Sequence, residues 1–342
     1  MFNPQNILVI DFGQLGDVVL SLPALRALRE RFPQAHITVM VGKPGAELVT
    51  LSGYANATLM VDRVALRDGP KLVSIGRIVK LVKDVRQRKF DFVVDLHSLS
   101  ETNLLGFLSG APKRLYSRRP GRSIDILANF TPQPPVEKDH RARHLIDRYL
   151  DVVSSVGVAN ADRLPKLRTR AEDVAVVDKL LRKGKAEAGS PLIGFFPGAG
   201  HESRRWPLER FAQLAEFLQR NDGVRPIVFA GPEERALVPQ MKSLFPPATI
   251  ILDKLSIPQL AAAQARISVL VSNDTGPMHI AAAVGTPVVL LLDRRAPESY
   301  IPPGEQHRVI YSNTIPDITV EEVYEATRAV LAGGRTATLF AS

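Results

Sequence analysis

The chain has 342 residues, 45% of them hydrophobic, which is ample for more than one packed core, so two domains are expected. Its 44 lysines and arginines exceed its 35 aspartates and glutamates, and the net charge of +9 suits a phosphorylated substrate, an anionic membrane or a nucleic acid, or serves solubility alone. The absence of cysteine excludes disulfides, thiol catalysis and cysteine-bound metals.

Neither a signal peptide nor a membrane-spanning helix is expected from the sequence. The opening MFNPQNILVIDFG has no basic segment followed by a long apolar run, so no signal peptide is expected. No stretch reaches the roughly 20 uninterrupted apolar residues that a membrane-spanning helix needs. We therefore expect a cytoplasmic protein.

Short apolar runs alternate with helical patterns along the first half. Strands are predicted at 6–12, 36–41, 58–62 and 90–96, and helices at 16–32, 71–89 and about 143–156. Continuous Val/Ile/Leu runs separated by helices are typical of parallel strands covered on both faces. This half is therefore expected to be a doubly wound α/β domain.

A second alternation begins near residues 160–170. Its strands are predicted at 192–197, 225–231, 249–253, 267–273 and 287–293, and the last helix, about 319–332, follows HRVIYS. We expect two Rossmann-like domains, 1–165 and 166–342, facing a central cleft, with the last helix a candidate to pack back on the first domain. Ligands of open α/β sheets bind at the carboxyl ends of the strands.

One strand of the second half ends in VSNDTGPMHIAAA. Pro277 is tolerated in the first turn of a helix, and the free N–H groups and positive dipole end there favour an anion such as a pyrophosphate. Gly276 permits close approach and Thr275 adds a hydroxyl donor. The alternative is structural: Asp274 or Thr275 caps the helix and His279 is a core histidine.

A second loop indicates the same ligand. After the strand LIGFFP come Gly198, Gly200, then Arg204 and Arg205, and a helix opened by Trp206-Pro207. Small residues and two guanidinium groups suit phosphate oxygens, although a solvated surface pair is the alternative. Trp206 is expected to pack in either case.

The first half offers IDFGQLGDVVLSLPAL, which lacks the third glycine of a dinucleotide-binding turn. Asp17 stands at a helix start, where it is either an N-terminal cap or a general base kept ionised by the helix dipole. A Rossmann oxidoreductase is therefore disfavoured. A nucleic-acid binder is disfavoured too, because aromatic residues make up only 6% of the chain.

Four segments together resemble glycosyltransferase family 9, the heptosyltransferases of bacterial lipopolysaccharide core assembly. They are GDVVLSLPALRALRERFP, DLHS, PGAGHESRRWPLERFAQLA and SNDTGPMHIAAAVGTPVVLL. The resemblance implies a GT-B fold and inverting, metal-independent transfer of heptose from ADP-heptose to a lipopolysaccharide core or related glycolipid. It implies no cofactor. A donor of another kind, or a non-catalytic nucleotide-sugar binder, is the alternative.

The resemblance also assigns residues. It makes Asp17 the catalytic base, and Gly13, Gln14, Gly16 and His97 the acceptor side. The implied donor-binding residues are Gly198, Arg204, Glu233 (or its neighbour Glu234), Asp274, Thr275, Gly276, Pro277, Met278 and His279. No metal site is expected, because no carboxylates cluster as a divalent cation requires.

Three positions depart from the family pattern. Arg204 replaces the usual Lys, Asp11 stands where Arg is common, and residues 291–300 lack the usual Gly-Pro-Thr. The basic stretches 71–89, 112–123 and 140–144 are candidates to dock the enzyme on the inner membrane, or are ordinary solvated surfaces.

Overall fold

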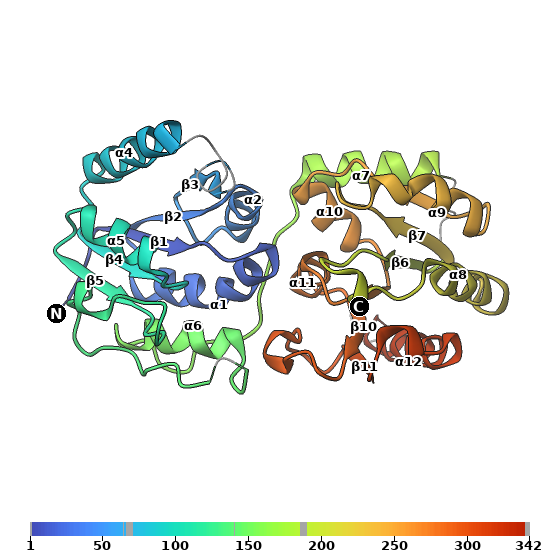
Figure 1. Cartoon of the computed structure of the whole chain (residues 1–342). Helices are drawn as coiled ribbons and strands as arrows, with labels where there is room; N and C mark the ends of the chain where they lie inside the picture. Colours follow the sequence, from blue (N-terminus) through green and yellow to red (C-terminus); the bar gives the residue numbers. More distant parts are fainter. Residues whose placement is uncertain (1, 64, 66–70, 140, 185–189, 339–342) are drawn as a thin grey trace. The chain divides into compact units, whose positions relative to one another are not determined.

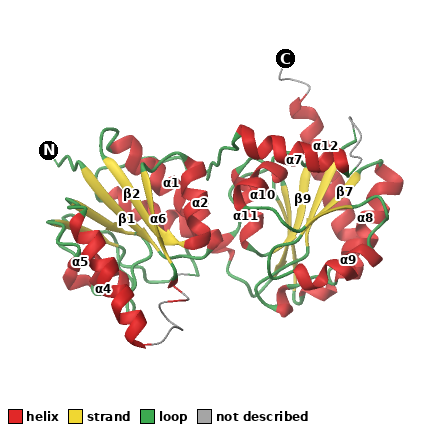
Figure 2. Ribbon diagram, turned by 90° about the horizontal axis from the view of Figure 1, so that it is seen from above, coloured by secondary structure: helices red, strands yellow, loops and turns green. Residues whose placement is uncertain are grey.

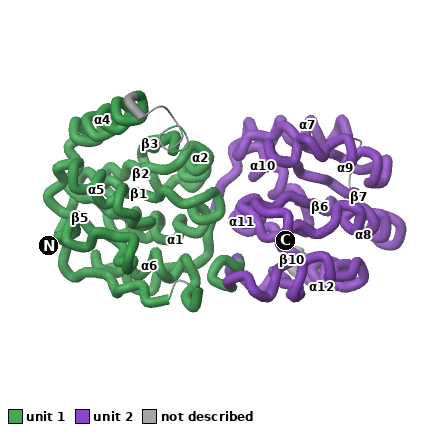
Figure 3. Tube along the Cα trace, viewed as in Figure 1, with its two compact units in different colours: residues 1–166, 298–301 green, residues 167–297, 302–342 purple. Residues whose placement is uncertain are grey.

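The computed structural model describes residues 2–63, 65, 71–139, 141–184 and 190–338. The chain forms two compact units (Figure 3), one of residues 1–166 with 298–301 and one of residues 167–297 with 302–342. Each unit is a parallel sheet with helices on its faces (Figure 1). No helix in these ranges is long and apolar enough to cross a bilayer.

The first unit is built on a five-stranded parallel sheet. Its strands are β1 (Asn6–Asp11), β2 (His36–Gly42), β3 (Ala57–Val61), β4 (Phe92–Asp95) and β5 (Lys113–Tyr116). Its helices are α1 (Leu15–Arg31), α2 (Lys43–Ser52), α4 (Lys71–Gln87), α5 (Ser100–Leu108) and α6 (Leu145–Ser154), with the 3₁₀ turn η1 (Asp125–Leu127). The strands lie in the order β3-β2-β1-β4-β5.

Burial explains why these segments fold as they do. The four apolar residues Ile7–Ile10 of β1 are fully buried, because helices cover the sheet on both sides. Figure 2 shows α1, α2 and α6 on one side of the strands and α4 and α5 on the other. Helix α6 packs on α1 through Leu145, Ile146, Tyr149 and Val152, which recur at helical spacing.

The second unit repeats the plan with six strands. They are β6 (Leu192–Phe196), β7 (Arg225–Phe229), β8 (Ile250–Leu252), β9 (Val269–Asn273), β10 (Val288–Asp293) and β11 (Arg308–Ser312). The helices are α7 (Ala171–Lys183), α8 (Leu208–Asp222), α9 (Val238–Leu244), α10 (Ile257–Gln264), α11 (Gly276–Ala283) and α12 (Val320–Thr338). The order is β11-β10-β9-β6-β7-β8, and α12 packs on α8 and this sheet, within its own unit.

The predicted strands are confirmed within one or two residues at most ends, but β5 and β11 were missed. Both are edge strands, and their outer residues are half-buried or exposed. Charged residues interrupt the apolar pattern in both segments, KRLY and RVIYS, whereas the other two edge strands, β3 and β8, carry apolar runs and were predicted. Helices α2 and α5, of ten and nine residues, were missed as well, since so few turns give a weak helical period.

Both sheets reverse their winding direction at one place. In the first the reversal falls between β1 and β4, and in the second between β6 and β9. Ligands of doubly wound sheets bind where the strand order reverses, at the carboxyl ends of the two strands. The topology therefore selects four segments: those that follow β1, β4, β6 and β9.

Candidate functional site

Asp17, which follows β1, is the third residue of helix α1. Its Oδ2 accepts a hydrogen bond of 2.9 Å from the backbone N–H of Gln14, the residue that precedes the helix. A Cβ on Gly13 would lie 2.4 Å from the Cβ of Asp17, so only glycine fits beside it. Asp17 thus caps the helix with one oxygen, while Oδ1 makes no hydrogen bond to any residue that the structure describes.

The carboxyl of Asp17 faces a small cavity of about 30 Å³. The other residues that line it are Leu96, His97, Ser117, Arg119, Glu137, Leu145, Arg148, Tyr149 and Tyr300. Burial raises the pKa of Asp17, while the Gln14 N–H and the guanidinium groups of Arg148 and Arg119 act to lower it. Asp17 is thus a partly buried carboxyl with one free oxygen among cations, as a general base requires.

Sequence reasoning missed two arginines of this cavity. Glu137 holds both, with Oε1 2.8 Å from Nη2 of Arg148 and Oε2 3.7 Å from Nε of Arg119. Arg119 also donates from Nη1 to the carbonyl oxygen of His97 at 2.6 Å. The only earlier signal was the basic stretch 112–123, which contains Arg119 but does not distinguish it from its neighbours.

His97, which follows β4, lies near Asp17 and beside a second carboxyl. Its Nδ1 is 3.9 Å from Oδ1 of Asp11. Burial and the surrounding arginines lower the pKa of His97 to about 3, so the ring is neutral near pH 7 and does not form an ion pair. Gly16 and Gln14 lie at the start of α1, so the structure brings all four predicted acceptor-side residues to this end of the sheet.

Asp11 is a buried carboxyl that the sequence marked only as a departure from the family. It is fully buried, Oδ1 accepts from the N–H of Gly13 at 2.9 Å, and Oδ2 has no partner in the described chain. Burial raises its pKa to about 6, and the charge of Asp17 acts in the same direction. Two carboxyls on either side of Gly13 therefore disfavour each other's ionisation.

Asp11→Asn is expected to flatten the pH dependence of stability. The folded pKa of about 6 lies above 3.8, so as pH rises the unfolded chain ionises first and the free energy of unfolding falls between about pH 4 and 6. The difference between a pKa of 3.8 and one of about 6 corresponds to about 3 kcal/mol in the free energy of unfolding. The variant should not lose this stability as pH rises. Urea unfolding at several pH values measures it; parallel curves for the two proteins would contradict the assignment.

In the second unit, Asn273 at the end of β9 joins two loops. Its Oδ1 accepts from the N–H of Trp206 at 3.0 Å, and its Nδ2 donates to the carbonyl oxygen of Pro197 at 2.8 Å. Asn273 and Trp206 are both buried. Sequence reasoning noted this asparagine without a role; the structure shows that it fixes the loop after β6 against the loop after β9.

Arg204 and Asp274 lie together at the same end of the sheet. Nη1 of Arg204 is 3.5 Å from Oδ2 of Asp274, and the arginine side chain is half-exposed. Burial raises the pKa of Asp274, and Arg204 lowers it. Arg205 instead donates from Nε and Nη2 to the carbonyl oxygen of Ala199, so it stabilises its own loop. Of the two arginines in this loop, Arg204 is therefore the one whose guanidinium is placed to contact a bound anion.

Helix α11 begins at Gly276 with Thr275 as its cap residue and Pro277 in its first turn, as predicted. Pro277 has no N–H, and the N–H of Met278 donates to the carbonyl oxygen of Thr275 at 3.2 Å. The N–H groups of Thr275 and Gly276 make no hydrogen bond within the described part of the chain. These amides and the positive end of the helix dipole favour an anion at this position.

Met278 and His279 are buried, so their side chains belong to the core beneath the anion site. The side chain of Trp206 is buried too and donates from Nε1 to Ile318, which confirms its expected packing role.

The acidic residue near Gly198 is Glu234. Its Oε2 accepts from the N–H of Gly231 at 2.9 Å, and a Cβ on Gly198 would lie 2.2 Å from its Oε1. Burial raises the pKa of Glu234. Glu233, the first choice from sequence, is exposed. The carboxyl that lies against the Gly198 turn therefore belongs to the second member of the pair.

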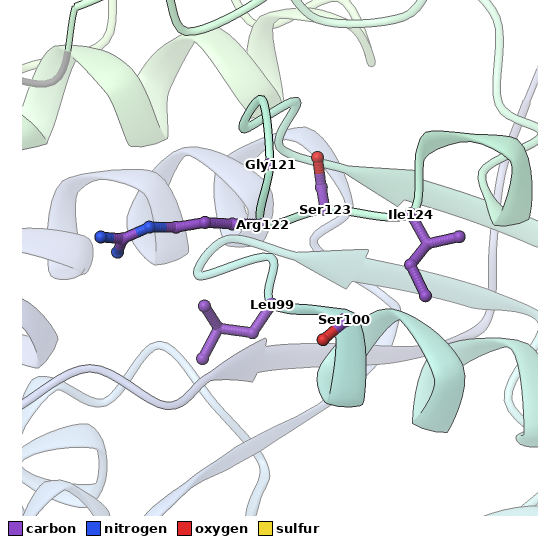
Figure 4. Close-up of a pocket in the computed structure, with 6 residues that line it drawn as sticks. All are labelled: Leu99, Ser100, Gly121, Arg122, Ser123 and Ile124. Carbon is purple, nitrogen blue, oxygen red and sulfur yellow. The ribbon is translucent and has the colours of Figure 1, made fainter.

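A larger cavity of about 530 Å³ lies in the first unit (Figure 4). It is lined by Leu99 and Ser100 at the start of α5 and by residues 121–124, which precede η1. Among the described residues, no group of three or more histidine or acidic side chains is placed to hold a metal ion.

The model of glycosyltransferase family 9 (heptosyltransferase) matches residues 78–327, most of the chain. The chain belongs to glycosyltransferase family 9. This family 9 chain is thus a glycosyltransferase of the heptosyl type, as the motifs implied.

The family 9 chain is similar over its whole length to proteins of this kind. It is 26% identical to lipopolysaccharide heptosyltransferase 2 of Escherichia coli, over 96% of the chain and 99% of that protein. Its fold matches a family 9 glycosyltransferase from Veillonella parvula (TM-score 0.85, 24% identity, 97% and 98% covered). It also matches the E. coli heptosyltransferase WaaC solved with ADP-2-deoxy-2-fluoro heptose (TM-score 0.76, 18%, 95% and 99%). The predicted GT-B fold is confirmed.

Proposed function

We propose that this protein transfers heptose from ADP-heptose to the inner core of lipopolysaccharide or a related surface glycan. Family membership supports the heptosyl group, and the E. coli relatives named for lipopolysaccharide and solved with an ADP-heptose analogue support the acceptor and donor. The observation that carries the proposal is the pairing, on one chain, of a free carboxylate oxygen on Asp17 with an anion site at Thr275 and Gly276.

The proposed chemistry is a single displacement with inversion. As the acceptor hydroxyl attacks the anomeric carbon, its proton passes to Oδ1 of Asp17, and the bond from that carbon to the diphosphate breaks to release ADP. The amides of Thr275 and Gly276 and the guanidinium of Arg204 stabilise the charge that develops on the diphosphate. These groups supply the positive field, so we propose that no divalent metal takes part.

Product analysis tests the whole proposal. The protein is incubated with a panel of nucleotide-sugars and deacylated core oligosaccharide, with and without EDTA, and the products are weighed by mass spectrometry. A heptose added from ADP-heptose, equally in EDTA, is the expected result. Use of a different donor would reject the donor assignment, hydrolysis without transfer would reject the acceptor, and loss in EDTA would show that a metal is needed.

Arg204→Ala is expected to weaken ADP binding by about 10- to 100-fold. A charge-assisted hydrogen bond contributes about 1.5–3 kcal/mol, and the variant also leaves Asp274 without its cation beside the diphosphate. Isothermal calorimetry with ADP measures the change. Arg220→Ala, which removes an exposed arginine that pairs with Glu216, is the matched control and should bind like wild type. Equal affinity in both variants would remove Arg204 from the donor site.

We also propose that the enzyme works at the cytoplasmic face of the inner membrane, where a lipid-linked core acceptor is exposed. No spanning helix occurs in the described chain, so any membrane contact would be peripheral.

A further inference from the structure

Exposed apolar side chains gather on one part of the first unit. Among the described residues, fourteen large hydrophobic side chains are exposed, and seven of them lie on α4, α5 and η1. They are Val73, Ile75, Ile78, Val79, Leu104, Phe107 and Ile126, with exposed fractions from 46% to 88%. Helix α5 packs against both α4 and η1, and Figures 1 and 2 show α4 beside α5. We call this surface the α4–α5 face.

Helix α4 has the spacing of an interfacial helix. Ile75, Ile78, Val79 and Val82 stand at i, i+3, i+4 and i+7, which aligns them along one side. Ser74 and Val85 are buried, and Val82, at the end of the stripe, is partly buried and packs against the same core cluster as Val85. The first three residues of the stripe are exposed, so the packing of α4 onto its unit leaves an apolar stripe uncovered.

The same helix is strongly basic. Residues 71–89 contain seven lysines and arginines and one acidic residue, Asp84. Arg77, Lys80 and Lys83 are exposed, and no ion pair among the described residues involves α4. Arg77 donates from Nη1 to the carbonyl oxygen of Ala65, which does not balance its charge, so all three cations can attract an external anion.

The other two basic stretches behave differently. Arg118 pairs with Asp125, Arg119 lies near Glu137, and Arg143 pairs with Asp151, so three of the seven lysines and arginines in these stretches have an acidic partner inside the unit. His140, in the third stretch, lies outside the described residues. The three basic stretches look alike in sequence, but in the structure only the stretch that contains α4 has no ion pair among the described residues.

We propose that the α4–α5 face docks on an anionic lipid bilayer, with the apolar stripe of α4 at the acyl boundary and its basic residues on the headgroups. Apolar burial combined with cationic attraction is the basis of interfacial helix binding. The cavity of about 530 Å³ borders this face, since its lining includes the first residues of α5 and those before η1. The inference goes beyond the proposed reaction; only the membrane's role as source of acceptor rests on the proposed function.

A second copy of the chain fits the face less well. A symmetric self-contact would set the basic residues of α4 against the same residues of the partner, and like charges across an interface oppose binding. An anionic surface satisfies both the charge and the apolar stripe.

Vesicle flotation tests the proposal with the full chain. Wild-type protein is expected to float with vesicles of phosphatidylglycerol and phosphatidylethanolamine, less so in high salt, and to stay behind with pure phosphatidylcholine. The variant Ile75→Gln/Ile78→Gln/Val79→Gln should lower the partition coefficient at least tenfold, and Lys80→Gln/Lys83→Gln should lower it and reduce its salt dependence. A matched control, Leu164→Gln/Val176→Gln/Leu244→Gln, changes three similarly exposed side chains elsewhere and should bind like wild type.

Two further measurements separate docking from catalysis. Every variant should glycosylate deacylated core oligosaccharide at the wild-type rate, while the two α4 variants should be slower on acceptor embedded in anionic vesicles. Docking would be overturned if the wild-type protein did not float, or if the α4 triple variant floated equally well. It would also be overturned if light scattering showed that the triple variant changes only the self-association of the protein. Failure of wild type on soluble acceptor, with docking intact, would instead reject the proposed function.

Discussion

Asp17→Asn is expected to lower kcat by about 10²- to 10⁴-fold, the range that a positioned general base contributes. The amide oxygen of Asn can still accept the hydrogen bond from the Gln14 N–H, so α1 keeps its cap and the fold should be unchanged. Only the ability to take up a proton at the free oxygen is lost. The measurement is kcat with ADP-heptose and deacylated acceptor, beside circular dichroism and ADP affinity, both of which should match wild type.

Glu30→Gln is the control for that experiment. It makes the same acid-to-amide change on the same helix, at an exposed position near its other end, and should retain full activity. A kcat for Asp17→Asn within threefold of wild type would mean that the carboxyl only caps the helix, and another group would have to accept the proton.

Asn273→Ala is expected to have the largest effect on stability and to weaken donor binding at the same time. The change leaves the buried N–H of Trp206 and the carbonyl of Pro197 without their side-chain partner. An unsatisfied buried polar group costs about 1–3 kcal/mol, so the loss for two such groups is on the order of 2–4 kcal/mol. Scanning calorimetry should show Tm lower by about 5–15 °C.

ADP binding to Asn273→Ala, measured well below its Tm, should also weaken, because the loops that carry Arg204 and Gly276 are no longer held together. Asn221→Ala removes an exposed asparagine of α8 and serves as control, with Tm and affinity unchanged. Unaltered ADP affinity in a destabilised Asn273→Ala would show that the two loops bind independently of this contact.

The inner strands and the loops after them could be predicted from the sequence, because burial on both faces leaves an uninterrupted apolar run that ends in polar or small residues. Asp274 and Gly276 were selected in this way, directly after such a run, and Asp17 lies a little farther on, in the first turn of the helix that follows β1. Strands β5 and β11 were not, since their segments KRLY and RVIYS mix charged with apolar residues and carry no such run.

Side-chain partnerships were out of reach for a different reason. Glu137 meets Arg119 and Arg148, and Asn273 meets Trp206, across separations along the chain that no local pattern records. The same holds for Glu233 and Glu234, which are adjacent in sequence but differ in burial, because only the second is turned toward Gly198. The sequence was enough to locate the loops, but tertiary packing determines which of their side chains are free to contact a ligand.

Residues 298–301 belong to the first unit although the chain on both sides of them belongs to the second. Nε2 of His144 donates a hydrogen bond of 2.7 Å to the carbonyl oxygen of Ile301, and Tyr300 forms part of the wall around Asp17. The polypeptide therefore crosses between its halves three times rather than once. A fragment cut at residue 166 would lack Tyr300 and would therefore leave the wall around Asp17 incomplete.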